Sequence, residues 1–484
     1  MILMPATHSD LVVVLPHILL AAGTVAVLIA SAFARRDSTI LYLTALSLLC
    51  PIATLGIMYA NVPASTAGLF LFDGLSLISN GLILTTSLSV AVLAYPYFRM
   101  HPVPPREFFI LLLLATLGCM VIVSSSHFAA LFLGIELAGI PLIAMAAYHR
   151  GSTIGIEAGI KYLILAGLSS AVLLFGIALL YAGSGSLSFG PALASLVRPV
   201  MEAPLIRAGA AFLVAGIAFK LALVPFHVWA PDVYQGAPAP VTLFVATASK
   251  AAAITALLRL FPPDVIDGDR YLFVLFVAFS LASMIAGNVL ALRQQSVKRM
   301  LAYSSIAHSG YLLVAFLSAG PLAHAAIVLY LICYVVTNLC AFGVVSLLSG
   351  GGSDADNLND YAGLSWRKPW LSSVLMVAIL SLLGIPLTAG FIAKFFVAAA
   401  GMASMRLVLV LALVLNTAVS AYYYLRIIMT MFLGPDDILP GEIGNSQRRA
   451  PAIGALFVSF QAALLLFIGI APKYLLQLIG RLMS

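Results

Sequence analysis

Four lysines in this sequence lie where an ammonium group is costly to place. Lys161, Lys220, Lys250 and Lys394 each fall inside an apolar segment: EAGIKYLIL, AGIAFKLALVPFH, LFVATASKAAAITALL and LTAGFIAKFFVAA. A lysine at the middle of a membrane costs about 2.5–3.5 kcal/mol on insertion scales, and such residues mark ion and proton pathways. The lysines therefore predict a path for protons. For Lys161, which stands near a helix start, the alternative is that its ammonium reaches the cytoplasmic surface.

Glu136, in ALFLGIELAGIPL, is the acidic residue that lies deepest in an apolar helix. An isolated buried carboxylate would take up a proton, so we expect a cationic partner, and Lys220 is the candidate. Burial disfavours the charged form of a lysine, whereas a nearby carboxylate favours it. Moving the carboxylate's charge would therefore switch the lysine between holding and releasing a proton.

Two of the lysine segments also carry a proline in mid-span. Pro225 follows Lys220 in FKLALVPFH, and Pro386 precedes Lys394 in LLGIPLTAGFIAK. An internal proline removes a backbone hydrogen bond and kinks or breaks a helix. We therefore expect two broken helices, each with a lysine beside the break.

Two histidines are further candidates for the same path. His227 lies seven residues after Lys220, beyond the predicted break, and His308 lies in AYSSIAHSGYLL. The alternative for each imidazole is that it satisfies a neighbouring carbonyl. No histidine pair has metal-ligand spacing with acids or cysteines, so no metal site is expected. The cysteines stand singly in apolar segments and are expected to be small buried hydrophobes: Cys50, Cys119, Cys333 and Cys340.

The elements that position these residues follow from composition. Of the 484 residues, 63% are apolar and 8% are charged, against roughly a quarter charged in soluble proteins, so the chain is predicted to be an all-α polytopic membrane protein. A crossing needs about 20 apolar residues. Fourteen runs qualify: 11–33, 40–60, 70–95, 107–124, 127–149, 157–182, 207–228, 238–260, 271–292, 300–318, 323–348, 369–400, 405–432 and 451–475.

The even number of runs puts both termini on one side, and loop charges predict which side. The loops on the side of the membrane opposite the termini hold Arg35, Arg36, Arg99, Arg106, Arg150, Arg293, Lys298, Arg299, Arg367, Lys368, Arg448 and Arg449. The side that holds the termini has fewer basic residues: Arg198, Arg207, Arg259, Arg270, Arg406, Lys473 and Arg481. Because cytoplasmic loops are enriched in Lys and Arg, both termini are predicted on the periplasmic side of a bacterial inner membrane.

Several functions are excluded by what the sequence lacks. The net charge is +7, but no basic run interleaved with aromatics is present, so nucleic-acid binding is rejected. No GxGxxG, P-loop, HExxH or GxSxG motif occurs, so no nucleotide or flavin site is expected in this chain. The longest connections, 183–206 and 349–368, are too short for a soluble domain and are predicted as a surface loop and a solvated loop.

The broken helices occupy matching places in two halves of the chain. If helices four to eight form one unit and nine to thirteen another, each break falls in the fourth helix. Five crossings is an odd number, so the second unit must run inverted. The predicted divisions are three N-terminal helices (1–106), a first five-helix repeat (107–260), an inverted second repeat (271–432) and a last loop and helix (433–484).

Longer stretches around these residues resemble a known family. They are EAGIKYLILAGLSSAVLLFGIALLY, FKLALVPFHVWAPDVYQGAPAPVT, SVKRMLAYSSIAHSGYLLVA, LLGIPLTAGFIAKF and YYYLRI. The chain resembles the antiporter-like membrane subunits of proton-pumping NADH:quinone oxidoreductase (respiratory complex I), and EAGIKY and YYYLR favour the subunit N branch. The N-terminal 60 residues and the 435–450 loop match only loosely.

The resemblance implies a fold of fourteen helices with two inverted five-helix repeats, and it implies roles. Glu136 and Lys220 would be the charge pair, Lys250 the central relay, Lys394 the lysine toward the exit half-channel, and Lys161 the extra lysine of the sixth helix. This chain would carry no redox cofactor. NADH, flavin, iron–sulfur clusters and quinone would be bound by partner subunits, among them the other membrane subunits of a hetero-oligomer.

Two functions remain open at this stage. The first is proton translocation as one subunit of a redox-driven NADH:quinone oxidoreductase. The alternative is a cation/proton antiporter subunit of the multi-subunit sodium/proton type, which would use the same fold and charge pair.

Overall fold

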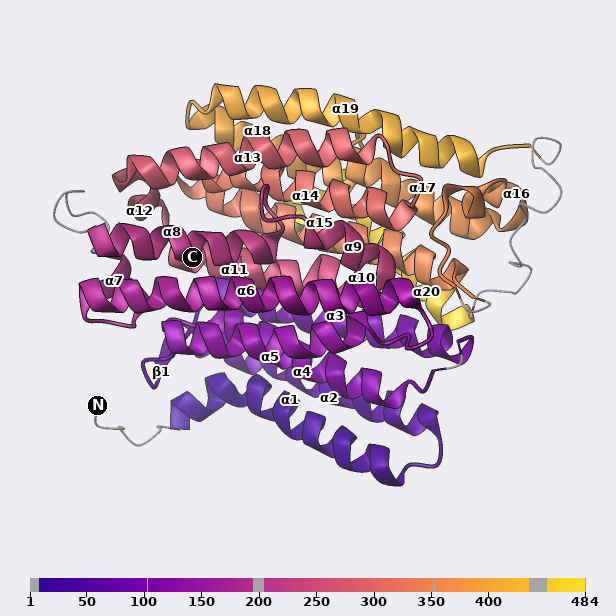
Figure 1. Cartoon of the computed structure of the whole chain (residues 1–484), viewed down its shortest axis with the longest axis horizontal. Helices are drawn as coiled ribbons and strands as arrows, with labels where there is room; N and C mark the ends of the chain where they lie inside the picture. Colours follow the sequence, from indigo (N-terminus) through magenta and orange to yellow (C-terminus); the bar gives the residue numbers. More distant parts are fainter. Residues whose placement is uncertain (1–7, 102, 195–203, 351–352, 435–450, 484) are drawn as a thin grey trace.

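The computed structural model describes residues 8–101, 103–194, 204–350, 353–434 and 451–483, and in this part of the chain nearly every segment is helical. The long helices run side by side in one bundle (Figure 1). Twelve helical segments of the described residues are long and apolar enough to cross a membrane. With α14 (Val297–Phe316), and with the broken pair α17 (Pro369–Leu383) and α18 (Ala389–Ala403) counted as one crossing, the fourteen predicted crossings are confirmed.

The first half of the chain supplies seven crossings, the last of them broken. The unbroken ones are α1 (His8–Phe33), α2 (Asp37–Tyr59), α3 (Gly74–Arg99), α4 (Arg106–Ser124), α5 (Phe128–Ala146) and α6 (Thr153–Ser184). The seventh consists of α8 (Pro204–Leu221) and α9 (Trp229–Gly236). Polar side chains cap the starts of α6 and α3 and so fix their positions: Ser152 accepts from the backbone N–H of Gly155, and Asp73 forms a capping box with Ser76.

The eighth crossing is not a uniform helix. It consists of α10 (Ala239–Phe244), a π-helical turn η3 (Val245–Ser249) and α11 (Lys250–Leu260). The remaining crossings are α13 (Arg270–Ala291), α14, α15 (Pro321–Leu348), α17 with α18, α19 (Leu407–Met431) and α20 (Ala452–Ile470). The predicted run 451–475 is too long, because α20 ends at Ile470 and a separate amphipathic helix α21 (Pro472–Met483) follows.

Short elements close the two ends of the bundle. They are the antiparallel hairpin of β1 (Ala64–Thr66) and β2 (Phe70–Phe72), the helices α7 (Phe189–Ala194), α12 (Pro263–Gly268) and α16 (Leu364–Arg367), and the 3-10 turn η4 (Leu358–Tyr361). Figure 1 shows β1, α7 and α12 toward one end of the bundle and α16 at the other. The backbone of Leu482, near the C-terminus, packs on Gly74 at the start of α3. The start of α1 and the end of α21 therefore lie at the same end of the bundle, as expected for an even number of crossings.

The core of the bundle is formed by α10 to α11, α14 and α15. In an 18-residue window of the crossings Ala239–Leu260 and Pro321–Leu348, 89% and 94% of the residues are buried, against 28% in such a window of α2. Helices α1, α2, α6 and α19 therefore lie at the periphery, facing lipid or other subunits. The central helices are the ones that carry His308 and Lys250.

One glycine contact occurs in both predicted repeats with the same spacing. Gly118 of α4 lies against the backbone of Ala138 of α5, and Gly287 of α13 lies against the backbone of Ala307 of α14. The partner follows the glycine by 20 residues in each pair. In this register Ser305 corresponds to Glu136. The boundaries of the repeats stay a prediction. Three residues used to predict the orientation lie outside the described residues: Arg198, Arg448 and Arg449.

Candidate proton path

Lys220 lies at a helix end that the first break creates. Helix α8 stops at Leu221, and Ala222 takes up a left-handed backbone conformation with φ of +55°. The free carbonyls at the C-terminal end of a helix favour a cation. The Nζ atom of Lys220 packs against Gly139 of α5, where an added Cβ would lie 3.5 Å away. Pro225 lies in the exposed segment between α8 and α9, as predicted.

Glu136 lies on α5 one turn before Gly139. Its side chain is half-buried, and its Oε1 accepts a hydrogen bond of 2.5 Å from Ser170 of α6. Within the described residues no ion pair of 4.0 Å or less joins Glu136 to Lys220. Lys220 therefore contacts α5 one turn from Glu136 without forming an ion pair with it, and the pairing of the two residues stays a prediction.

Lys250 begins α11, directly after the π-helical turn. Its Nζ donates to the carbonyl of Ser305 at 2.9 Å and to the Oγ of Ser309 at 3.1 Å. The hydroxyl of Ser309 also lies 3.2 Å from the carbonyl of Leu221, the last residue of α8. The π-helical turn is a feature that the sequence did not reveal, and such turns are frequent at functional sites. These contacts join Lys250 to the first break, next to Lys220.

The ammonium of Lys394 binds the helix end that the second break creates. Helix α17 ends at Leu383, Gly384 has φ of +86°, and α18 begins at Ala389. The Nζ of Lys394 donates to the carbonyls of Leu382 and Leu383 at 2.9 and 3.0 Å, two of the groups that a helix end leaves without partners. Its ammonium also lies 5.0 Å from the centre of the Tyr311 ring. The exposed Pro386 lies in this break.

His308 and a small cavity lie between Lys250 and Lys394. The Nδ1 of His308 is 2.7 Å from the hydroxyl of Tyr330. Tyr334, whose hydroxyl is 2.6 Å from the Oγ of Ser305, lines the cavity together with His308 and Lys394. The cavity measures about 10 Å³, which is about the volume that one water molecule needs. Polar side chains therefore lead from Lys250 toward Lys394.

Lys161 and His227 lie outside this central row. The side chain of Lys161 is 43% exposed and pairs with Glu157 and Asp232 at 2.7 Å each. This placement favours the alternative in which its ammonium reaches the surface. His227 lies half-buried in the first break, and its Nδ1 is buried without a hydrogen-bond partner among the described residues.

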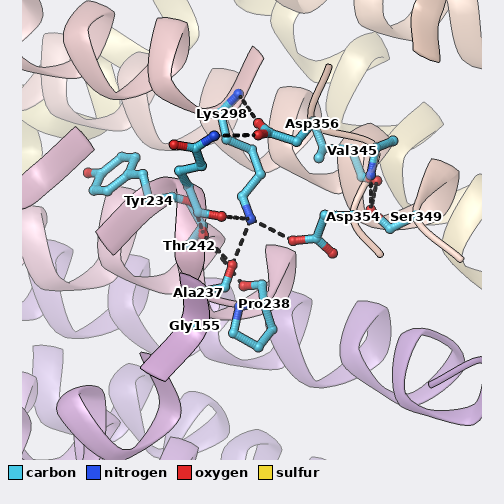
Figure 2. Close-up of polar contacts among 12 residues, drawn as sticks. Gly155, Tyr234, Ala237, Pro238, Thr242, Lys298, Val345, Ser349, Asp354 and Asp356 are labelled. Atoms are coloured by element: carbon cyan, nitrogen blue, oxygen red, sulfur yellow. Dashed lines mark hydrogen bonds and ion pairs between the residues drawn. The ribbon is translucent and has the colours of Figure 1, made fainter. Parts of the chain in front are cut away.

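Lys298 is the residue that sequence reasoning missed. The sequence predicts Lys298 in a loop, but it lies in the first turn of α14, is completely buried and pairs with Asp354 at 2.5 Å (Figure 2). The side chain of Asp354 is only 12% exposed, so the prediction that 349–368 is a solvated loop is wrong for this part. The one available signal was the sequence DAD of this loop, whose two acidic residues are opposite in charge to the adjacent Lys298 and Arg299.

The described residues contain no group of three or more His, Cys, Asp or Glu side chains placed to hold a metal. Three cysteines are buried thiols, whereas Cys50 is exposed on α2. A bundle of fourteen crossings, two of them broken beside lysines and joined by a third lysine at a π-helical turn, defines a polytopic membrane protein. It is built around a row of lysines, of which Lys250 and Lys394 are buried and Lys220 is partly buried.

The comparisons place this protein in a family. Residues 125–420 match the family described as NADH:quinone oxidoreductase/Mrp antiporter, TM. This is more than half of the 484 residues, and the chain belongs to that family.

Two relatives are similar in sequence to this chain over nearly its whole length. NADH-quinone oxidoreductase subunit N of Methylococcus capsulatus is 42% identical over 475 residues, covering 97% of this chain and 95% of the relative. A chain of respiratory complex I from Thermus thermophilus with bound aureothin is 33% identical, with a TM-score of 0.82 and coverage of 96% of this chain and 98% of that one.

Two further solved structures show the fold alone. A chain of the archaeal membrane-bound sulfane sulfur reductase is 24% identical with a TM-score of 0.82, covering 98% of this chain and 96% of that one. A chain of the Mrp complex from Dietzia sp. is 20% identical with a TM-score of 0.84, covering 98% of each chain.

Proposed function

We propose that this chain is a proton-translocating membrane subunit of an NADH:quinone oxidoreductase, of the subunit N type. The observation that carries the proposal is the row of Lys220, Lys250 and Lys394, placed at two helix breaks and one π-helical turn. The 42% identity over 97% of the chain to subunit N of Methylococcus capsulatus supports this type over the alternatives.

The geometry supports a stepwise transfer along the row. A proton on Lys220 would be held or released according to the charge state of Glu136, which lies on α5 one turn from the contact between Lys220 and Gly139. From the first break, Ser309 offers a hydroxyl between the carbonyl of Leu221 and Lys250. Hydroxyl groups both donate and accept, so they pass a proton by exchanging one hydrogen bond for another.

The second half of the transfer would run from Lys250 to Lys394. Tyr334 and His308 lie between them, and a water in the small cavity would complete the connection. We assign Lys394 to the exit half of the path. His227, with an unpartnered Nδ1 in the first break, is proposed to bind a water there, and Lys161 is proposed to act at the surface.

The chemistry of electron transfer would take place elsewhere. We propose that NADH, flavin, iron–sulfur clusters and quinone are bound by partner subunits, and that this chain contributes proton movement to their reaction. Its partners would be the other membrane subunits and the lipid bilayer, with no nucleic acid. We place it in the inner membrane of a bacterial cell with both termini on the periplasmic side, and we divide it at residues 106, 260 and 433.

A cation/proton antiporter is the second candidate, because the family includes Mrp antiporters and the Dietzia Mrp chain shares the fold. Deletion of this chain separates the two. Loss of NADH-driven quinone reduction in isolated membranes, with unchanged growth in sodium, is the outcome that the proposal requires. Sodium-sensitive growth with intact NADH-driven quinone reduction would contradict it and favour the antiporter.

A further inference from the structure

Lys298 is completely buried at the start of α14 and uses all its hydrogen-bonding capacity. Its Nζ donates to the Oδ2 of Asp354 at 2.5 Å, to the carbonyl of Gln235 at 2.8 Å and to the carbonyl of Ala237 at 2.6 Å (Figure 2). An ammonium group has three donors and no acceptor. No N–H of Lys298 is therefore left to exchange with water or with another side chain.

The carbonyls that Lys298 holds belong to the end of α9. Helix α9 ends at Gly236, so Gln235 and Ala237 lie on either side of its last residue. The carbonyls at a helix end lack partners inside the helix. Gly236 also packs closely on Ile154 and Ala158 of α6, where a Cβ would clash. The second half of the first broken crossing is thus fixed between α6 and the ammonium of Lys298.

Asp354 ties two more elements to the same point. Its Oδ1 accepts a hydrogen bond of 2.6 Å from the hydroxyl of Tyr97 on α3, and Asp354 itself belongs to the loop after α15. Burial alone would raise the pKa of the Asp354 carboxyl, but the charge of Lys298 and the two hydrogen bonds hold this pKa below its ordinary value. Asp354 is therefore ionised at neutral pH.

A second set of contacts runs parallel to the first. Arg299, the next residue of α14, pairs with Asp232 of α9 at 2.7 Å and donates to the Oε1 of Gln235 at 3.1 Å. The amide of Gln235 in turn donates to Asp356 at 2.9 Å. Successive residues of α14 therefore hold both the middle and the end of α9.

The lysines of the proton path differ from Lys298 in this respect. The side chains of Lys250 and Lys394 each make two hydrogen bonds, and no hydrogen bond of the Lys220 side chain is found in the described part of the chain. A proton carrier needs a free position through which a proton can leave. The saturated Lys298 is suited to a fixed charge, whereas the other three lysines retain that freedom.

The position of α9 matters because α9 reaches the path. Tyr234 of α9 lies with its hydroxyl 3.4 Å from the Oγ of Ser305, and the carbonyl of Ser305 binds Lys250. Ser305 lies seven residues after Lys298 on α14, about two helical turns along the same face. A shift of α9 against α14 would therefore move groups beside Lys250.

We propose that Lys298 and Asp354 form a permanent charged clamp that positions α9 against α14, so that Lys298 is a positioning residue for the proton path and does not itself carry protons. The part of the proposal that concerns proton movement rests on the proposed function. The clamp itself is a statement about how α9 is held.

The test uses the intact complex that contains this chain and compares several variants. Lys298→Met removes the clamp but leaves Asp354 buried without a partner, which can impair assembly. The double variant Lys298→Met with Asp354→Asn removes both charges and avoids that problem. Lys298→Arg keeps a cation that is never deprotonated in proteins. Lys368→Met is the matched control, because the described residues provide no hydrogen bond or ion pair for the side chain of Lys368.

Two measurements are made on each variant: hydrogen exchange of the backbone amides of residues 229–237, and NADH-driven proton pumping as a function of pH. In the double variant we expect exchange of these amides to rise about tenfold or more, because hydrogen bonds to a charged group contribute enough free energy for a factor of that order. Pumping should fall several-fold at neutral and alkaline pH, where Asp354 is ionised in the wild type, without a shift of the pH profile in that range. Lys298→Arg should restore most pumping, and Lys368→Met should change neither measurement.

Three results would overturn the proposal. Unchanged exchange of 229–237 in the double variant would show that Lys298 does not hold α9. A pH profile shifted at neutral or alkaline pH, or a Lys298→Arg variant as inactive as the double variant with normal exchange, would show that Lys298 carries protons. Because hydrogen exchange does not depend on the reaction, faster exchange in a chain whose pumping is independent of Lys250 would uphold the clamp and refute the proposed function.

Discussion

Replacement of Lys394 should abolish proton pumping while the complex still assembles. Lys394→Met removes two hydrogen bonds from a charged donor to the carbonyls of Leu382 and Leu383, each worth about 1.5–3 kcal/mol, or roughly 3–6 kcal/mol together. It also removes the cost of a buried ammonium, about 2.5–3.5 kcal/mol. The net destabilisation is therefore about 0–3 kcal/mol, which a large membrane complex tolerates.

Lys394→Arg makes this prediction sharper. Arginine keeps the positive charge and hydrogen-bond donors, but it does not release its proton in proteins. If Lys394 works by taking up and releasing a proton, the Arg variant should pump as poorly as the Met variant. The amount of assembled complex is measured by native gel electrophoresis, and pumping by the quenching of a pH-sensitive dye in inverted membrane vesicles given NADH. Normal pumping in an assembled Arg variant would refute a proton-carrying role and leave Lys394 a fixed charge.

The remaining predictions concern groups on either side of the row. Glu136→Gln should lower pumping steeply, and adding Lys220→Met should lower it no further, because the two residues act as one unit; additive losses in vesicle assays would contradict the pairing. Lys161→Met should cost only about 0–1 kcal/mol of stability, as is usual for exposed ion pairs, and should retain most pumping; a loss as large as that of a row lysine would show that its 43% exposed side chain serves the path. The lowered pKa of Asp354 means that its pairing with Lys298 stabilises the fold above about pH 4 and is lost as the pH falls below its folded pKa. Acid inactivation of quinone reduction should therefore be less steep in Asp354→Asn, and an unchanged acid limb would contradict this linkage.

The helix breaks were accessible from the sequence because their cause is local. A proline removes one backbone hydrogen bond wherever it stands, so Pro225 and Pro386 predicted both breaks, and the lysines beside them indicated the proposed path. What the sequence did not reveal is how these lysines are satisfied. The carbonyls that bind Lys394 come from the other side of the break, 11 and 12 residues earlier in the chain, and such contacts depend on how the chain folds back.

Lys298 shows the same limit more clearly. From its position in the sequence it resembles any loop lysine of a cytoplasmic face, since it stands beside polar residues at a helix start. Its partner Asp354 is 56 residues away, and the loop after α15, which carries Asp354, folds back onto the bundle. Burial of a charge by a distant loop leaves no periodic signal in either segment. The π-helical turn before Lys250 was missed for a related reason, because the composition of VATAS is that of an ordinary helix.

Proton pumping by the reconstituted complex tests the central claim most directly. The complex that contains this chain is purified, inserted into liposomes in sodium-free buffer and supplied with NADH and quinone, in its wild-type form and as Lys250→Arg. The wild type should acidify the vesicle lumen as NADH is oxidised, and the variant, assembled in equal amount, should not. Equal acidification by both forms, or acidification by the wild type only when sodium is present, would contradict a proton path through the buried lysines.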